Sequence, residues 1–433
     1  MTEENMSKLE ELIQQYCPDG VEWKKYYDVC DLIRGITYNK NQEAKTEKED
    51  AYKVLRANNI TLYLNTLNFD DVKLVSKDVV VKPEQHLYAG DILMCAGSGS
   101  KEHVGKVAYI FQNMDYTFGG FMAVVRCKED VIPRYMFHIL ASHYFASHLE
   151  TQINSSTINN INRQVMQSFV FPVPPLPVQE EIVRILDAFT ELQAELQAEL
   201  QKRKQQYSYY LDNLLNFKNI NRGGYQAEVR WMKMSDIGTF YSGLSGKTKE
   251  DFQNGNAKFI SYVNIFNNPS LITNVDDRVK ILEGERQNTI QYGDLLFTGS
   301  SETPDECGMC SVLTHHTEEK LYLNSFCFGF RFNDLSGINP EFMKFLFRSS
   351  VIRKLICKTA NGVTRFNISK KEFAKIVIPI PSLAEQDHIA SVLDKFYFLV
   401  GDITIGLPAE IEKRRQQYEY YRDKLLTFKR KGA

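Results

Sequence analysis

One helical pattern occurs twice in this 433-residue chain, and it constrains the fold more than any other feature. The stretch QKRKQQYSYYLDNLLNFK recurs as EKRRQQYEYYRDKLLTFK, with 12 identities in 18 positions. Upstream, PVPPLPVQEEIVRILD (172–187) matches PIPSLAEQDHIASVLD (379–394) at an offset of 207 residues. Apolar residues recur every three or four positions in both copies, as in helices that pack against a partner helix. The pattern therefore predicts two long helices, at 175–218 and 382–430.

Each predicted helix carries an apolar seam that needs a partner, either the other helix packed antiparallel or a docked subunit. The predicted seam and docking residues are Ile182, Ile185, Phe189, Leu192, Leu196, Tyr207, Tyr210, Leu214 and Phe217 in the first helix, and Ile389, Val392, Phe396, Leu399, Ile403, Tyr418, Tyr421, Leu425 and Phe428 in the second. Gly401, Gly406 and Pro408 interrupt the second seam, so we expect a kink or a break there.

The segments between the helices are also duplicated. AGDIL (89–93) matches YGDLL (292–296), and PRYM at the start of a predicted helix (134–150) matches PEFM. Valine-, isoleucine- and aromatic-rich runs between glycine and asparagine turns predict strands in both copies. We therefore predict an α+β fold with two similar modules, separated by two helices in an antiparallel coiled coil with pseudo-two-fold symmetry. The predicted boundaries are an N-terminal helix in 1–19, modules at 20–174 and 225–381, and a linker at 219–224.

The composition and motifs exclude several classes of protein. The net charge is −2, the eight cysteines are too few for a disulfide scaffold, and no run of eighteen apolar residues occurs, which together predict a cytoplasmic protein. GSGSKEHVGK (97–106) lacks the Walker spacing, and no motif for methyl transfer is found. Cys307 and Cys310, with His315 and His316, have the spacing of metal ligands. The matching turn of the first module has no cysteine, so we predict no metal site.

Basic and polar side chains gather in the predicted loops of both modules. Arginine, lysine, asparagine and tyrosine are the residue types that hold phosphates and read base edges, although each can also be an ordinary surface residue. The candidate DNA-binding residues are Arg34, Tyr38, Lys40, Arg56, Asn58, Lys101, Lys106 and Arg163 in the first module, and Lys247, Lys249, Asn264 and Arg365 in the second.

A tetrapeptide repeats three times inside the first helix, as TELQ-AELQ-AELQ (190–201). Adding four helical residues rotates the rest of the helix by about 40° beyond a full turn. One base pair rotates a duplex by about 35°. The repeat is therefore a plausible unit for changing the spacing between two readers of DNA, although it also simply has high helix propensity. The second helix lacks the array.

The order of these motifs resembles the DNA-specificity subunit of type I restriction-modification systems. The resemblance rests on CPDGVEW near the N-terminus, AGDIL and YGDLL, the PxPxLxxQxxI…LD entry to each helix, and the tetrapeptide array. It implies a non-catalytic subunit whose two target recognition domains read a bipartite, asymmetric DNA sequence. It also implies partners: a pair of modification subunits would act with S-adenosylmethionine, and restriction subunits with ATP and magnesium.

Two other interpretations stay open at this point. The chain could be a self-sufficient DNA methyltransferase or nuclease with an unrecognised site, or a protein-binding scaffold with no role on DNA. Neither explains the duplication of the modules as directly.

Overall fold

The computed structural model describes residues 3–44, 50–62, 64–153, 160–217, 229–401 and 406–432. The chain divides into two compact units, residues 1–197 with 411–433 (unit 1) and residues 198–410 (unit 2). The predicted linker 219–224 lies outside the described residues. Within the described ranges, no helix is long and apolar enough to cross a membrane.

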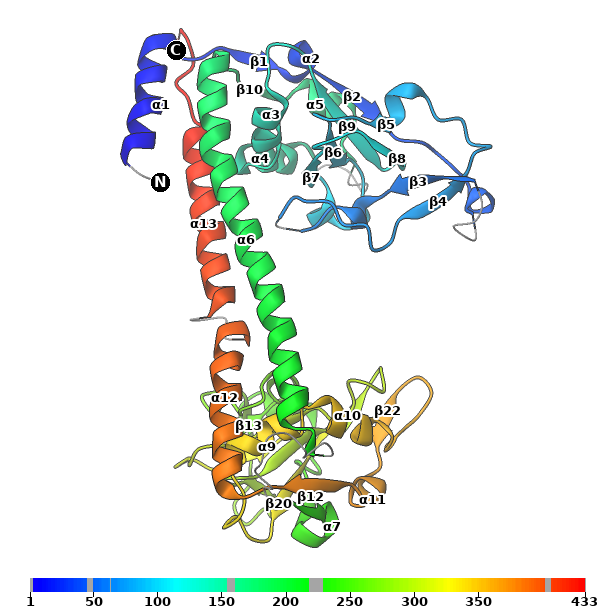
Figure 1. The fold of residues 1–433 in the computed structure, drawn as a ribbon, viewed down its shortest axis with the longest axis vertical. Helices are drawn as coiled ribbons and strands as arrows, with labels where there is room; N and C mark the ends of the chain where they lie inside the picture. Colours follow the sequence, from blue (N-terminus) through cyan, green and yellow to red (C-terminus); the bar gives the residue numbers. More distant parts are fainter. Residues whose placement is uncertain are drawn as a thin grey trace, which may run out of the picture. The chain divides into compact units, whose positions relative to one another are not determined.

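Unit 1 contains an α+β module with two four-stranded sheets, β2-β9-β6-β7 and β4-β3-β8-β5, and a β1-β10 pair (Figure 1). Its strands are β1 (Trp23–Lys25), β2 (Cys30–Arg34), β3 (Ala51–Leu55), β4 (Lys73–Ser76), β5 (His86–Leu87), β6 (Ile92–Cys95), β7 (Val107–Tyr109), β8 (Met114–Phe118), β9 (Met122–Cys127) and β10 (Val170–Pro172). Its helices before the long one are α1 (Glu3–Tyr16), α2 (Tyr26–Val29), α3 (Pro133–Leu140), α4 (His143–Ile153) and α5 (Arg163–Gln167), with 3-10 turns η1 (Lys40–Gln42), η2 (Ala57–Asn59), η3 (Pro83–Gln85) and η4 (Lys101–His103).

Unit 2 repeats this topology with the sheets β12-β20-β16-β18 and β14-β13-β19-β15, the pair β11-β23, and a further sheet, β17-β22-β21. Its strands are β11 (Arg230–Lys233), β12 (Gly238–Ser242), β13 (Ala257–Ile260), β14 (Arg278–Val279), β15 (Thr289–Ile290), β16 (Leu295–Thr298), β17 (Ser300–Ser301), β18 (Cys310–Val312), β19 (Leu321–Leu323), β20 (Cys327–Phe332), β21 (Ala360–Asn361), β22 (Phe366–Ile368) and β23 (Val377–Ile380). Its shorter helices are α7 (Met234–Ile237), α8 (Tyr262–Asn267), α9 (Pro340–Leu346), α10 (Ser350–Cys357) and α11 (Lys370–Phe373), with a 3-10 turn η6 (Lys249–Phe252). The prediction of two similar α+β modules is confirmed.

The aspartate of the repeated AGDIL and YGDLL motifs is buried in both units and stabilises a turn. Asp91 accepts hydrogen bonds from Nε and Nη2 of Arg126, both at 2.8 Å, and also from the backbone N–H of Tyr88. Asp294 makes the equivalent contacts with Arg331, at 2.9 and 2.6 Å, and with the backbone of residue 291. The motif and its matching arginine are therefore a structural device.

The glutamine of each PxPxLxxQxxI motif joins the start of a long helix to its module. The Gln179 side chain accepts the backbone N–H of Ile132 and donates to the carbonyls of residues 130 and 174, at 2.7 to 3.0 Å. Gln386 makes the same three bonds, to the N–H of Asn339 and to the carbonyls of residues 337 and 381. Both side chains are fully buried, so their hydrogen bonds replace those that water would make.

The long helices differ in detail from the sequence prediction. The first is continuous, as α6 (Leu176–Leu214), whereas the second consists of α12 (Leu383–Gly401) and α13 (Leu407–Leu425), which agrees with the expected break. The single helix predicted at 134–150 is wrong, because the structure divides it into α3 and α4. The carboxylate of Asp423 accepts the N–H of His143 at the start of α4, a tertiary contact that local periodicity does not reveal.

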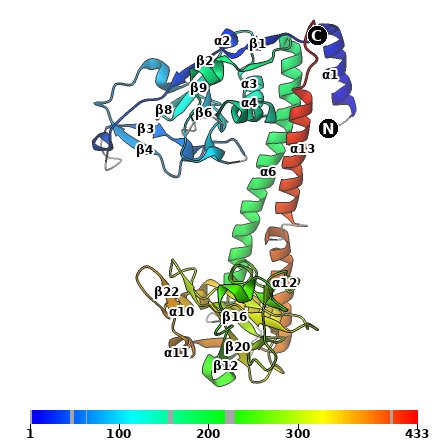
Figure 2. The same ribbon diagram turned by 180° about the vertical axis from the view of Figure 1, so that it is seen from behind.

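Each unit packs part of α6 against part of the second helix. In unit 1, α6 lies beside α13 (Figure 1, Figure 2). Phe189 stacks there on Tyr421, with ring centroids 5.6 Å apart. In unit 2, α6 lies beside α12, and the corresponding pair, Tyr210 and Phe396, stacks at 4.8 Å. Within each unit the two helical segments run antiparallel, as the colouring along the sequence shows (Figure 1, Figure 2).

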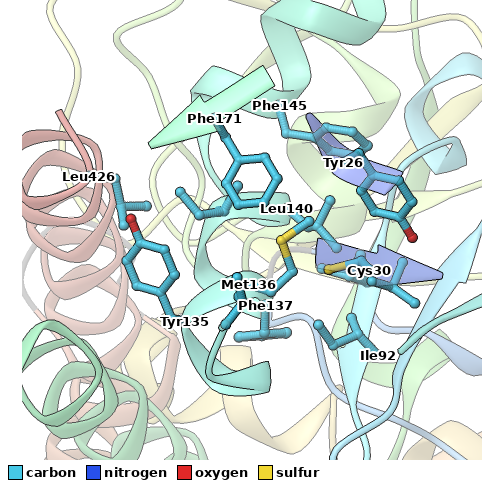
Figure 3. Close-up of a cluster of buried hydrophobic side chains, with 14 of the residues drawn as sticks. Tyr26, Cys30, Ile92, Tyr135, Met136, Phe137, Leu140, Phe145, Phe171 and Leu426 are labelled. Atoms are coloured by element: carbon cyan, nitrogen blue, oxygen red, sulfur yellow. The ribbon is translucent and has the colours of Figure 1, made fainter. Parts of the chain in front are cut away.

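The hydrophobic core of unit 1 includes the end of the C-terminal helix. Tyr135 and Leu140 of α3, Phe171 of β10 and Leu426, just after α13, belong to one buried cluster (Figure 3). In the same way, Leu215, just after α6, is buried in the core of unit 2. The end of α6 therefore completes the core of the module that follows it, whereas the end of α13 completes the core of the first module, far away in the sequence.

Most predicted seam residues lie inside these cores rather than on a free docking face. Buried or half-buried in the two units are Ile182, Ile185, Phe189, Leu192, Leu196, Tyr207, Tyr210, Leu214, Phe217, Ile389, Val392, Phe396, Tyr418, Tyr421, Leu425 and Phe428. Leu399 is 41% exposed and does not lie in the seam, where Val400, four residues after Phe396, is buried instead; a docking role for Leu399 stays a prediction. Ile403 lies outside the described residues.

A buried histidine makes unit 1 sensitive to acid. His138 is fully buried between Asp187, at 2.9 Å, and the hydroxyl of Tyr418, at 3.1 Å, while Arg134 and Arg422 add positive charge nearby. Burial lowers the pKa of His138 to about 4, from an ordinary value near 6.5. The unfolded state therefore binds the proton more tightly, and stability falls as the pH falls from about 6.5 towards 4.

We expect His138→Gln to flatten this pH dependence. In the native chain, His138 lowers the free energy of unfolding by about 3 kcal/mol as the pH falls from about 6.5 to about 4. This follows because one pKa unit corresponds to about 1.4 kcal/mol. Unfolding midpoints between pH 4.5 and 7.5 would test it, with the slope as the readout and the stability at pH 7 as the reference. Equal slopes in both proteins would contradict the assignment.

Candidate nucleic-acid interface

Three predicted DNA-binding residues of unit 1 line one cavity, together with the glycine-rich loop that follows β6. This cavity, the β9 pocket, has a volume of about 690 Å³. Its lining includes Tyr38, Arg56, Asn58, Gly97–Gly99, His103 and Phe121. Residues 38, 58 and 99 come from three different loops, so the strands of the two sheets bring them together.

Asp71 holds two of these side chains in place. Its carboxylate accepts Arg56 at 2.7 Å and the side-chain amide of Asn58 at 2.9 Å. Arg56 Nε and His103 Nδ1 are buried, and neither has a hydrogen-bond partner among the described residues. The Tyr38 hydroxyl is protonated at neutral pH, and burial raises its pKa further. The pocket therefore offers donors and acceptors in fixed positions.

Unit 2 has an equivalent cavity, the β20 pocket, with a volume of about 410 Å³. Its lining includes Tyr262, Val263, Ser300–Glu302, Glu306, Phe326 and Arg365. Strand register relates the two pockets. Cys95 pairs with Met122 in unit 1 and Thr298 with Cys327 in unit 2, so the loops that follow β6 and β16 occupy equivalent places.

The polar groups of the β20 pocket are also arranged by the protein. Arg365 donates to the hydroxyl of Ser300 at 3.2 Å and lies over the ring of Phe326, 5.8 Å from its centroid. Glu306 accepts the hydroxyls of Ser301 and Thr303 at 3.2 and 3.0 Å. The carboxylate disfavours a phosphate in this pocket and suits the amino groups of bases.

Two predicted DNA-binding residues of unit 2 are corrected by the structure. Asn264 is buried, and its side-chain amide donates to the carbonyl of Ile272 at 2.8 Å. The Lys247 side chain is 5% exposed and forms an ion pair with Glu285 at 2.6 Å. Both predictions are wrong in the structure, since internal partners occupy these polar groups.

Two predicted residues of unit 1 also hold backbone segments inside the fold. Arg34 donates to the carbonyl of Ile161 and to the side chain of Asn160. The Lys106 ammonium donates to the carbonyls of Ala57 and Ile60 at 3.1 and 2.8 Å, and burial lowers its pKa. These contacts are structural and contradict a free DNA-facing role for either side chain.

The remaining predicted residues stay on the surface of their units. Exposed side chains are found at Lys40, Lys101, Arg163, Lys249 and Arg365. Lys101 lies in η4, which follows the glycine-rich loop, and Lys249 begins η6. Their role in binding DNA stays a prediction.

The cysteines of the CxxC motif are buried in the fold of unit 2. The Cys307 thiol contacts the carbonyl of Phe366 at 3.4 Å, and burial raises the pKa of Cys310 to about 12. Among the described residues, no group of three or more histidine, cysteine, aspartate or glutamate side chains could hold a metal ion.

Sequence reasoning missed the aromatic residues of the two pockets, Phe121 and Phe326. Both stand directly before a buried strand, in GGF and NSF, where a phenylalanine is expected to be part of the core. Only the folded structure reveals that these rings face outward.

Two modules of one topology, each with a cavity of ordered polar groups beside an exposed aromatic ring, define a duplicated recognition protein. A family model, the type I restriction modification DNA specificity domain, matches residues 18–204 and 226–413. The chain belongs to this family. It is a DNA-recognition subunit of a type I restriction-modification system, as the motifs predicted.

Individual relatives agree with this assignment. The EcoR124I/EcoR124II specificity subunit of Escherichia coli is 34% identical over 268 residues, which are 59% of this chain and 61% of that protein. The EcoKI specificity subunit of Escherichia coli K12 is 27% identical over 402 residues, covering 88% of this chain and 82% of that protein. The match therefore covers less than two thirds of the length of the EcoR124I/EcoR124II specificity subunit.

The fold is also similar to that of a solved structure. A chain from work on the complex assembly and conformational transition of the type I R-M system has a TM-score of 0.58 and 15% identity. The similarity covers 94% of this chain and 98% of the other. At this identity the similarity concerns the fold alone.

Proposed function

We propose that each unit reads one half of an interrupted, asymmetric DNA sequence, and that α6 and the C-terminal helices set the gap between the halves. The observation that carries this proposal is the pair of equivalent pockets with different polar groups. The β9 pocket contains Arg56, Asn58 and His103. The β20 pocket instead contains Val263 and Glu306. Different donors and acceptors favour different bases, so the two halves of the target should differ.

The chemistry of modification and cleavage would belong to partner subunits. S-adenosylmethionine would act through modification subunits, and ATP and magnesium through restriction subunits, in the cytoplasm. This chain would supply the recognition surface and the scaffold on which those subunits assemble.

Footprinting of the complex with its modification subunits tests this proposal. We expect two short protected blocks separated by an indifferent gap, because each unit contacts its own half-site. A single continuous block would contradict the bipartite interpretation. Methyl transfer or DNA cleavage by the purified chain alone, given labelled S-adenosylmethionine or magnesium, would instead favour the self-sufficient enzyme.

Two copies of the modification subunit would bind in two equivalent grooves of this chain. The α6 groove of unit 1, about 530 Å³, is lined by residues 187–194 of α6 and by Phe111. The α12 groove of unit 2, about 900 Å³, is lined by residues 394–401 and Ile272. The two helical stretches correspond at the offset of 207 that relates the repeats. Exposed Phe111 and Phe398 give both grooves an apolar rim that a partner could cover.

We expect Phe111→Glu or Phe398→Glu to remove one modification subunit each from the complex. A carboxylate at an apolar contact weakens binding by desolvation, here by at least about 10-fold. Native mass spectrometry of the reconstituted complex would count the bound subunits. Val80→Glu, at an exposed apolar residue outside both grooves, is the matched control. Two bound subunits in both variants would contradict these docking sites.

A further inference from the structure

Phe121 and Phe326 are exposed phenylalanines at equivalent positions of the two units. Phe121 directly precedes β9 and is 75% exposed, and Phe326 directly precedes β20 and is 62% exposed. A large apolar ring in water is unfavourable, and single exposed rings are common enough to need no explanation. The same ring at the same place in two repeats, beside two candidate recognition pockets, does need one.

The backbone beneath each ring is held rigidly by the loop that follows the neighbouring strand. The N–H groups of Ala96 and Gly97 donate to the carbonyl of Phe121 at 2.9 Å, and the N–H of Gly299 donates to that of Phe326 at 2.8 Å. Each phenylalanine also lies in a tight turn, closed by the bonds from Met122 to Gly119 and from Cys327 to Asn324. The rings are therefore presented by a fixed backbone.

The close approach of these segments requires glycine in unit 2. A Cβ atom at Gly299 would lie 2.6 Å from the carbonyl oxygen of Phe326, which is too short for any side chain. The glycine lets the loop after β16 reach the turn that carries the ring. In unit 1 the equivalent hydrogen bond to Phe121 comes from Ala96, so the glycine is a feature of unit 2 alone.

The two phenylalanines are identical residues at equivalent positions, but the residues that line the pockets beside them differ. His103 of unit 1 corresponds to Glu306 of unit 2, and Asn58 corresponds to Val263, according to the strand register. Residues that choose between bases should differ between modules that read different half-sites. A residue that is the same in both modules should make a contact that does not depend on the base.

We propose that Phe121 and Phe326 each stack on a base of their half-site, as a sequence-independent aromatic anchor beside the discriminating polar groups. This inference rests on the proposed function, because it takes DNA as the ligand of both pockets. Every base has an apolar face, so stacking tolerates any sequence, whereas a contact with a thymine methyl group would need thymine in both halves. Insertion of such a ring between base pairs also unstacks them locally.

The experiment uses the complete complex with its modification subunits. Its DNA is a duplex that carries the sequence which the native complex methylates. We expect Phe121→Ala and Phe326→Ala each to weaken binding by about 10-fold or more, since aromatic stacking contributes on that scale. The ratio of affinities for native and half-site-altered duplexes should change little. Phe121→Tyr and Phe326→Tyr, which keep the ring, should retain binding within about 2-fold.

A spectroscopic readout separates stacking from a merely structural role. With 2-aminopurine placed in turn at each position of a half-site, we expect increased fluorescence at one position, and loss of that increase only in the alanine variant of the matching unit. Val80→Ala and Leu282→Ala, at exposed residues away from the pockets, serve as controls for units 1 and 2. If both Phe121→Ala and Phe326→Ala bound DNA with native affinity and left the 2-aminopurine fluorescence unchanged, the inference would be overturned. Failure of the unaltered complex to methylate a bipartite sequence would instead overturn the proposed function.

Discussion

Deleting Ala194–Gln197 from α6 will shift the preferred gap between the two half-sites while both half-site sequences stay the same. The deletion shortens the helix by about 6 Å and rotates the residues beyond it by about 40° relative to those before it. That rotation is close to the twist of one base pair, so the new gap should differ by about one base pair or a small number of them.

The repeat makes this deletion unusually conservative. The residues that move into positions 194–197 are again Ala-Glu-Leu-Gln, from 198–201. The side chains around Gln193 in the α6 groove are therefore replaced by identical ones, and Leu200 takes the place of Leu196. Loss of activity through a damaged α6 groove is therefore not expected.

Methylome sequencing of cells that carry the complete system measures both properties at once. Insertion of a further Ala-Glu-Leu-Gln unit is the matched control and should change the gap in the opposite direction. A changed half-site sequence, or an unchanged gap in both variants, would contradict the spacer role of α6.

Replacing Asp294 with alanine should destabilise unit 2 by about 3 kcal/mol, because it leaves a charged partner without its carboxylate. Asp294 is 1% exposed and accepts hydrogen bonds from Arg331, from the hydroxyl of Tyr241 at 2.7 Å and from a backbone N–H. The pKa of Tyr241 is raised, first by burial and then by this carboxylate. The expected loss is at the low end of the range for buried ion pairs, because the Arg331 side chain is 35% exposed and water can partly solvate it.

Chemical denaturation, or hydrogen exchange in β16 and β20, would measure the loss. Asp334→Ala is a matched control, because this exposed carboxylate accepts local hydrogen bonds from Ser336 and its loss should matter far less. Asp91→Ala tests the same device in unit 1. Stability equal to that of the control variant would show that the repeated motif has another purpose.

The repeated motifs were visible in the sequence, but their roles were not. AGDIL and YGDLL predicted a shared fold, whereas the pairing of each aspartate with Arg126 or Arg331 depends on neighbouring strands that are distant in sequence. The same is true of Gln179 and Gln386. Charge and loop position predicted Asn264 and Lys247 as DNA-binding residues, and internal partners occupy both. A residue type indicates what a side chain can bind, and only the fold decides what it meets first.

The sequence by itself determined the duplication, the α+β modules, the break in the second helix and the family, because periodicity and repeated order are properties of the chain. Only the tertiary structure decided which side chains meet. It placed the aromatic ends of each helix in a core formed by distant segments, turned Phe121 and Phe326 outward from positions before core strands, and brought Tyr38, Arg56 and Asn58 into one pocket. The physical reason is that helical spacing follows from near neighbours along the chain. Burial and pocket formation instead depend on contacts between residues that are far apart in the sequence.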